Sequence, residues 1–221
     1  PRWSAGSWKE QKFALHQLDS VPRSLLVQAG WQAPQLLQLK SADGGTNLYG
    51  VLYLPSDFDP TKKYPIITNV YPGPQADLVP RSFSLDDNGN QSLAELGCVV
   101  MNVSPRGSSP YRGRDFYNFS TGRLRDYPLA DDKASVEQVA RLYPAVDLDR
   151  VGIYGHSGGG FQTVAAMCTY PEFYKVGLAA SGNHDNNIYI NWWGEVFHGS
   201  PKIPTTMELI PQLKGKLMLA V

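Results

Sequence analysis

The sequence is poor in cysteine and histidine and has no long apolar run. Two cysteines in 221 residues cannot build a disulfide framework. Cys98 opens an apolar run and Cys168 lies among small apolar residues, so we expect both to be buried as small hydrophobic side chains. This leaves the redox compartment open. No apolar run approaches the roughly 20 residues that a membrane-spanning helix needs.

The sequence also has no excess of positive or negative charge. Lys plus Arg and Asp plus Glu each number 20, and the formal net charge is zero. A neutral balance gives no reason to expect nucleic acid or an acidic membrane surface as a partner. The 42% hydrophobic and 18% charged residues are typical of a globular protein. The length permits one large domain, or one domain with a fragment of another.

The most informative feature present is the segment Gly155-His-Ser-Gly-Gly159, which is a Gly-x-Ser-x-Gly motif centred on Ser157. A short β-rich run precedes it and an apolar run of helical character follows it, as a nucleophile elbow requires. In such a turn the flanking glycines avoid collisions, and the following helix directs free N–H groups toward the serine. The alternative interpretation is a glycine-rich turn whose serine only caps the helix.

The scarcity of histidine matters because a serine nucleophile needs a histidine base and an acid that orients it. In hydrolases of this design the partners follow in the order serine, acid, histidine. Asp185 is the one aspartate after Ser157, and His198 follows it, so a compact triad of these three residues is conceivable. In this triad the general base, His198, would come from an aromatic segment, whereas hydrolases of this design take the base from a loop after the final strand.

The remaining histidines offer no better base. His16 lies in the N-terminal segment, and His156 stands in the turn itself, where it would point elsewhere. A metal site of His184, Asp185 and His198 is weaker still, because their spacing matches no ligand motif. We therefore expect no metal and no cofactor.

Strand and helix patterns alternate along the chain, which predicts an α/β fold with a mostly parallel sheet and helices on both faces. Residues 1–34 show no sustained period. The helix predicted over residues 130–143 has Asp131 and Asp132 in its first turn. The expected elements are a hairpin over residues 35–54, strands at 64–70, 98–103, 151–154, 176–180 and 216–221, and helices near 91–96, 130–143, 158–168 and 188–197.

Several segments resemble the catalytic domain of prolyl oligopeptidase family serine peptidases, and most of all the bacterial dipeptidyl peptidase IV-like branch. The matches occur in the family's order over residues 35–221. The resemblance implies an α/β-hydrolase fold for residues 35–221, incomplete at the C-terminus. It implies that residues 1–34 are the exit and linker of a β-propeller. The matching segments are Ala42-Asp-Gly-Gly-Thr46, Tyr71-Pro-Gly-Pro-Gln75, Pro105-Arg-Gly-Ser108, Asp147-Leu-Asp-Arg150 and the elbow.

The resemblance also implies roles for individual residues. Tyr71 corresponds to the tyrosine whose hydroxyl stabilises the oxyanion, together with the backbone N–H of Gly158. Tyr189 and Trp193 fall where aromatic rings line the slot for a proline ring. Gly158 departs from the tyrosine that eukaryotic relatives carry after the nucleophile, which leaves that pocket wall undefined. The alternative for the aromatic segment is that Trp192, Trp193 and Phe197 form the buried face of a helix.

The function implied is an exopeptidase that cleaves peptides after proline or a small residue through an acyl-enzyme on Ser157. The alternatives are an esterase or acylaminoacyl hydrolase on the same fold, or a non-catalytic interaction relative. The family pattern places the acid and base beyond Val221, so we expect this segment alone to be inactive. A periplasmic or secreted location is suggested by the resemblance, and the oligomeric state stays open.

Overall fold

The computed structural model describes residues 24–74, 76–124, 128–185, 187, 189–199 and 204–221, and the backbone alone of residues 2–9, 12–20 and 126–127. Near the N-terminus, β1 (Arg2–Lys9) pairs antiparallel with β2 (Lys12–Ser20), and α1 (Ser24–Gln28) follows. The sequence showed no sustained period before residue 35, so these elements were not visible in its hydrophobic pattern. Backbone N–H and C=O groups can pair into a ladder without a regular hydrophobic alternation.

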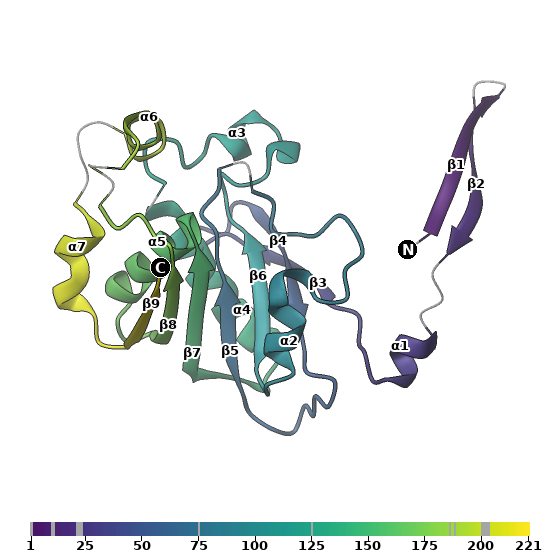
Figure 1. Ribbon diagram of the computed structural model, residues 1–221, viewed down its shortest axis with the longest axis horizontal. Helices are drawn as coiled ribbons and strands as arrows, with labels where there is room; N and C mark the ends of the chain where they lie inside the picture. Colours follow the sequence, from purple (N-terminus) through teal and green to yellow (C-terminus); the bar gives the residue numbers. More distant parts are fainter. Residues whose placement is uncertain are drawn as a thin grey trace.

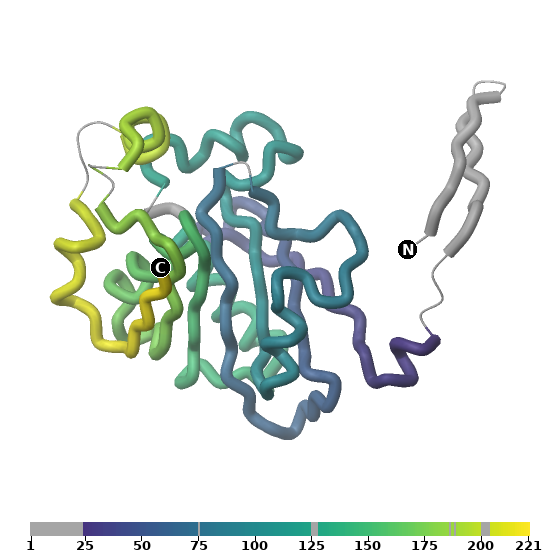
Figure 2. Tube along the Cα trace, viewed as in Figure 1, coloured from purple at the N-terminus to yellow at the C-terminus, as the bar shows by residue number. Residues whose placement is uncertain are grey.

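A seven-stranded sheet in the order β3-β4-β6-β5-β7-β8-β9 forms the centre of the molecule (Figure 1). The first three strands of that order pair antiparallel, and all later pairs are parallel. The chain runs from an early strand at one edge to its last strand at the other, as the colours of Figure 2 show. The strands are β3 (Gln35–Lys40), β4 (Asn47–Tyr53), β5 (Tyr64–Asn69), β6 (Val99–Ser104), β7 (Val146–His156), β8 (Tyr174–Ala180) and β9 (Lys216–Ala220).

The main core lies between this sheet and two long helices, α4 (Asp126–Leu142) and α5 (Gly158–Thr169). Val136 and Val139 of α4 and Ala165 of α5 pack against buried strand residues such as Ile66 and Met101. Removing these apolar side chains from water supplies the main stabilisation of the domain. The α/β-hydrolase fold predicted from the sequence is confirmed by this architecture. The shorter helices are α2 (Asn90–Ala94), α3 (Arg114–Tyr117), α6 (Asn191–Trp193) and α7 (Thr206–Leu209).

Helix α4 begins earlier than the sequence pattern indicated. Its first residue is Asp126, so Asp131 and Asp132 lie in the second turn and not in the first. Pro128 is tolerated near a helix start because the N–H it lacks has no helical partner there. Both aspartates are buried and do not face solvent at the helix end.

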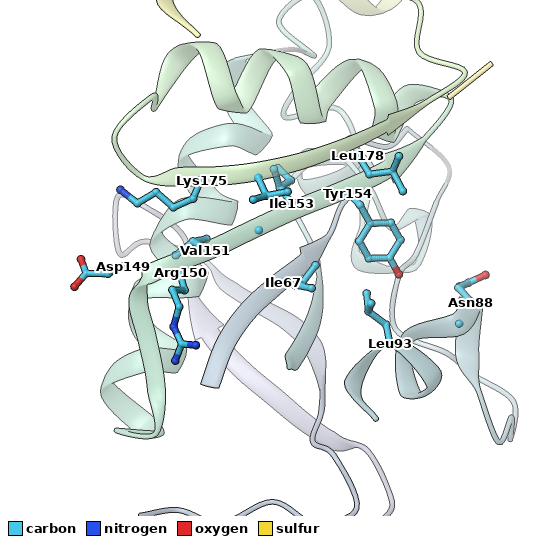
Figure 3. A pocket seen from close by; sticks show the side chains of 13 residues that line it. Ile67, Asn88, Leu93, Asp149, Arg150, Val151, Ile153, Tyr154, Lys175 and Leu178 are labelled. Carbon is cyan, nitrogen blue, oxygen red and sulfur yellow. The ribbon is translucent and has the colours of Figure 1, made fainter. Parts of the chain in front are cut away.

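The opposite face of the sheet is covered over its middle strands only. Helix α2 packs there through Ala94, against Tyr53 and Val100. Among the described residues no helix covers this face over β7, β8 and β9, where Val176 is 54% exposed and Met218 is 65% exposed. An apolar groove of about 620 Å³ runs between α2 and strands β7 and β8, lined by Ile67, Leu93, Tyr154, Val176 and Leu178 among others (Figure 3).

Candidate active site

The predicted elbow lies where β7 ends and α5 begins. Ser157 has φ 57° and ψ −118°, a region that a residue with a β-carbon rarely adopts. The turn is held by two backbone hydrogen bonds, from the Ser157 N–H to the Ala180 carbonyl (2.8 Å) and from the Phe161 N–H to the Ser157 carbonyl (3.1 Å). A strained residue that its surroundings hold in place is typical of a functional position.

The glycines of the motif are there because backbone passes too close for a side chain. A β-carbon added at Gly155 would lie 2.5 Å from the carbonyl carbon of Gly159. One added at Gly159 would lie 2.2 Å from the carbonyl oxygen of Val70, at the end of β5. These contacts bring α5 close to both β5 and β7, so a larger residue at either position would displace the serine.

Tyr71 and Gly158 lie side by side at the start of α5. A β-carbon added at Gly158 would lie 3.4 Å from Cζ of Tyr71, which is the ring carbon that carries the hydroxyl. The Tyr71 side chain is half-buried. The first N–H groups of a helix have no partner within the helix and carry its positive dipole end. The structure therefore places a phenol hydroxyl and a free helical N–H region next to the predicted nucleophile.

A cavity of about 560 Å³ adjoins Tyr71 on the α2 side of the sheet. Its wall includes Tyr71 and His156, so the exposed imidazole of His156 lies on the same cavity as the tyrosine. The other lining residues are Asn69, Val70, Ala76, Leu78, Asn88, Tyr154, Gly155, Leu178 and Ala180.

A partly buried polar cluster lies beside this cavity, and no sequence motif indicated it. The Tyr154 hydroxyl donates to Oδ1 of Asn90 (2.6 Å), which also accepts from Nδ2 of Asn69 (3.0 Å). Burial, and then the nearby charges of Asp86 and Asp87, raise the pKa of Tyr154 to about 12. The three hydrogen-bonded residues come from distant parts of the chain, so only the folded sheet brings them together.

Of the two predicted pocket residues, Trp193 ends α6, which a π-helical turn, Gly194–His198, follows, and Tyr189 lies in the bend just before α6. Tyr189 is 44% exposed, Trp193 is half-buried, and the rings of Trp193 and Phe197 are 4.6 Å apart. The alternative that Trp192 belongs to a buried helix face is wrong, because Trp192 is 59% exposed.

The buried member of this segment is His198, which is 3% exposed. Its ring packs edge-on against Phe161 of α5, with ring centroids 5.3 Å apart. The backbone carbonyl of Phe197 also accepts a hydrogen bond from the Leu124 N–H (3.1 Å). His198 thus fastens the aromatic segment to the helix that follows Ser157, a role that its sequence position did not reveal.

The other residues considered as acid, base or ligand have local contacts. Oδ1 of Asp185 accepts from the backbone N–H of Asn187 (3.0 Å). Burial lowers the pKa of His184. His16 falls outside the residues whose side chains are described. Within the described parts of the chain, no three His, Cys, Asp or Glu side chains are grouped so that they could hold a metal ion. Cys98 is half-buried and Cys168 buried, and both are free thiols whose pKa burial raises.

Comparisons with known proteins agree with this geometry. The family model described as Prolyl oligopeptidase family matches residues 83–207. Dipeptidyl peptidase 8 of Mus musculus is 33% identical over 225 residues, which cover 92% of this chain and 25% of that protein. The crystal structure of a putative dipeptidyl aminopeptidase IV from Bacteroides ovatus superposes with a TM-score of 0.79 at 30% identity, over 99% of this chain and 35% of that one.

A second solved structure, the acylaminoacyl peptidase of Pyrococcus horikoshii, superposes with a TM-score of 0.76 at 23% identity. It covers 93% of this chain and 34% of that one, and it shows the fold alone.

The sheet, its flanking helices and the strained serine turn define an α/β-hydrolase of the serine type. The chain belongs to the prolyl oligopeptidase family, a family of serine peptidases. It spans about a quarter of the length of the curated relative with which it shares 33% identity. Within the described residues no helix combines the length and the apolar character that crossing a membrane requires.

Proposed function

We propose that the full-length protein is a serine exopeptidase of the dipeptidyl peptidase type, which cleaves a peptide after proline or a small residue near its N-terminus. The hydroxyl oxygen of Ser157 attacks the substrate carbonyl, and a base takes its proton. The amine then leaves with a proton, and water hydrolyses the acyl-enzyme. Tyr189 and Trp193 contribute aromatic walls to the slot for the proline ring, which has no N–H to satisfy.

The observation that carries this proposal is the place of the Tyr71 ring beside Gly158 at the start of α5. A tetrahedral intermediate on Ser157 would bear its negative charge where the tyrosine hydroxyl and the Gly158 N–H can both donate. Each such donor is worth about 2.7–4 kcal/mol of barrier lowering. A protein that only binds partners needs neither this pair of donors nor a strained serine.

The acid and the base belong, in this proposal, to the part of the protein beyond Val221. The catalytic histidine would then enter from a loop that follows a later strand, as the chain order of this fold requires. The 221-residue chain by itself should therefore be inert toward peptides. Saturable cleavage by the isolated chain that Ser157→Ala abolishes would instead restore the compact triad with Asp185 and His198.

Turnover by the purified full-length protein tests the proposal. We expect Ala-Pro-p-nitroanilide to be cleaved with a higher kcat/KM than a simple p-nitrophenyl acyl ester or an N-acetylated amino-acid anilide. Ser157→Ala should lower kcat at least 1,000-fold, while Ser56→Ala, a serine in an exposed loop, serves as the matched control and should leave turnover unchanged. Preference for the ester or the acetylated substrate would reassign the protein to a hydrolase of another specificity, and no Ser157-dependent turnover would leave a binding role.

A further inference from the structure

The loop that carries Tyr71 rests directly on the segment after β6. A β-carbon added at Gly73 would lie 2.9 Å from the carbonyl oxygen of Gly107 and 3.0 Å from Cα of Ser108. Gly73 also has φ 78°, which favours glycine. The two backbones are thus in contact two residues after Tyr71, with no side chain between them that could yield.

Asp77 fastens the same loop at a second point. Its carboxylate accepts hydrogen bonds from Oγ of Ser104 (2.8 Å) and Oγ of Ser109 (3.0 Å), and the Ser104 oxygen accepts from the Leu78 N–H (2.8 Å). Burial alone would raise the pKa of Asp77, but the hydrogen bonds from Arg81, Ser104 and Ser109 outweigh it and hold the pKa below its ordinary value. The carboxylate therefore stays ionised and keeps its donors.

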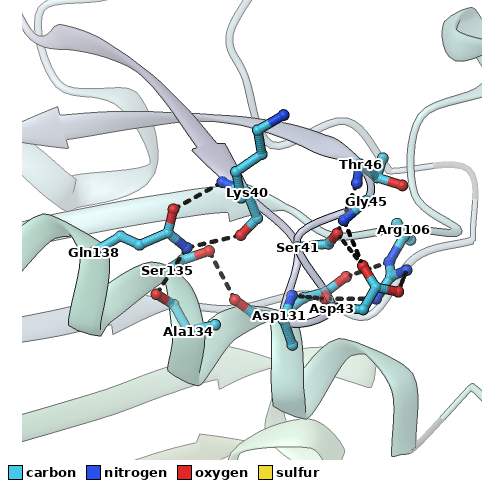
Figure 4. A network of polar contacts seen from close by, with 11 residues as sticks. Lys40, Ser41, Asp43, Gly45, Thr46, Arg106, Asp131, Ala134, Ser135 and Gln138 are labelled. Carbon is cyan, nitrogen blue, oxygen red and sulfur yellow. Dashed lines mark hydrogen bonds and ion pairs between the residues drawn. The ribbon is translucent and has the colours of Figure 1, made fainter.

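Residues 104–109 are in turn held by the inward-pointing side chain of Arg106 (Figure 4). Its Nε and Nη2 donate to the two oxygens of Asp131 on α4, each at 2.9 Å, and its Nη1 pairs with Asp43 at 2.5 Å. The guanidinium also lies 4.0 Å from the ring centroid of Phe119. The Arg106 side chain is 7% exposed, so this two-pronged contact is made largely away from water, where it is geometrically demanding.

Gly107 follows Arg106 directly and contacts the loop that carries Tyr71. Its N–H donates to the Phe116 carbonyl (2.8 Å), and a β-carbon added to it would lie 2.0 Å from Oγ of Ser120. Gly107 is therefore enclosed between Ser120 on one side and Gly73 on the other. A shift of the Arg106 backbone would therefore press Gly107 against the loop that carries Tyr71.

We propose that Arg106 is a positioning residue for the oxyanion site: it fixes residues 104–109, which in turn fix the hydroxyl of Tyr71. This inference rests on the proposed function, because it assigns the tyrosine as an oxyanion donor. Oxyanion donors act at 2.7–3.1 Å, and a misplacement of about 1 Å can cost roughly 100-fold in rate. Arg106 itself does not touch the substrate, so its loss should alter kcat while leaving KM nearly unchanged.

A double-mutant cycle in the full-length protein tests the proposal. Arg106→Lys keeps the charge but loses the fork to Asp131, and we expect kcat on Ala-Pro-p-nitroanilide to fall about 10-fold with KM within twofold. In a Tyr71→Phe background, which has no hydroxyl to misplace, the same change should cost less than twofold. Asp77→Asn weakens the hydrogen bonds to Ser104 and Ser109 without altering the contacts of Arg106, and it should likewise lower kcat only when the Tyr71 hydroxyl is present. If circular dichroism shows that Arg106→Lys is unfolded, Asp77→Asn replaces it in the cycle.

Arg150→Lys is the matched control, since Arg150 also donates to an aspartate, Asp147 (2.7 Å), and to the Lys63 carbonyl (3.0 Å), but lies away from the Tyr71 loop. It should leave kcat within twofold of the wild type. The positioning role would be overturned in an active enzyme if Arg106→Lys lowered kcat by the same factor with and without the Tyr71 hydroxyl. It would also be overturned if Arg106→Lys raised KM and left kcat unchanged. An absence of Ser157-dependent turnover in the wild type would instead overturn the proposed function, and the role of Arg106 with it.

Discussion

At the scale of single residues, the site is defined by groups that occupy costly conformations or environments. Ser157 holds a positive φ, and Gly155 and Gly159 leave no room for a β-carbon. The motif made these three positions predictable, because the elbow demands glycine at fixed offsets from the serine. The role of Arg106 was not predictable, since its partners Asp43 and Asp131 are far away in the sequence and only folding brings them together.

Asp132 is a buried titratable residue that the sequence pattern placed in the first turn of the helix and the structure places in the second. Its carboxylate accepts a hydrogen bond from Nε2 of Gln162, five residues after the nucleophile. Burial, and then the charge of neighbouring Asp131, raise the pKa of Asp132 well above its ordinary value. The folded protein thus favours the protonated carboxyl.

This shift predicts a pH-dependent effect of Asp132→Asn. Well below pH 4, both the folded and the unfolded wild type hold the proton, and the wild type and the variant should be similarly stable. Above that pH the unfolded state releases its proton while the folded state retains it, so wild-type stability falls as pH rises. The variant cannot ionise and should be more stable at pH 8, on the order of 1 kcal/mol. Thermal unfolding between pH 4 and pH 8 measures the difference.

The same substitution at the adjacent position is the control. Asp131→Asn removes the negative charge and one of the two oxygens that accept from Arg106, and it should destabilise the protein by about 3–5 kcal/mol at pH 8. A stability gain from Asp132→Asn that does not change with pH, or a loss comparable to that of Asp131→Asn, would contradict the protonated state of Asp132.

At the scale of secondary-structure elements, β8 and β9 form the least protected part of the sheet. Strand β9 pairs with β8 alone among the described strands, and Met218 and Leu178 lie opposite each other in this pair. Both side chains are exposed, at 65% and 38%. A contiguous apolar face beside an edge strand favours association with other chains.

The isolated 221-residue chain should therefore self-associate, and a charge on this face should suppress it. We expect Met218→Lys to shift the chain toward monomer, with at least a threefold rise in the concentration at which association begins. Size-exclusion chromatography with light scattering measures this. Met207→Lys is the matched control, because Met207 is equally exposed, at 62%, but lies on α7. Equal effects of the two variants would show that added charge acts generally and that this face has no special role.

Element types were easier to predict than their ends or their partners. The hairpin of β3 and β4, the buried strands and the helix after Ser157 follow from hydrophobic period and turn residues, and all are present. The start of α4 was predicted four residues too late, because Asp131 and Asp132 were placed in its first turn, whereas the helix begins at Asp126. The burial of His198 against Phe161 could not be predicted, since it depends on how the aromatic segment packs onto α5.

At the scale of the whole molecule, parallel strands bring the site together at one edge of the sheet. Tyr71 follows β5 closely, Ser157 follows β7, and the end of β8 holds the Ser157 N–H through Ala180. Open α/β sheets place their sites at the carboxyl ends of such strands. The elbow was predictable from its Gly-x-Ser-x-Gly motif. Tyr71 was assigned by family resemblance, because a tyrosine after a strand has no distinctive sequence pattern.

The role of Ser157 as an activated nucleophile is the central claim, and covalent labelling tests it most directly. The full-length protein is treated with a fluorophosphonate, which reacts with activated serine hydroxyls, and the modified peptide is located by mass spectrometry. We predict one adduct per chain, on the peptide that contains Ser157, at a rate that Tyr71→Phe lowers at least 10-fold. Labelling of a different serine, or turnover of peptide substrate that persists while Ser157 stays unmodified, would contradict the account.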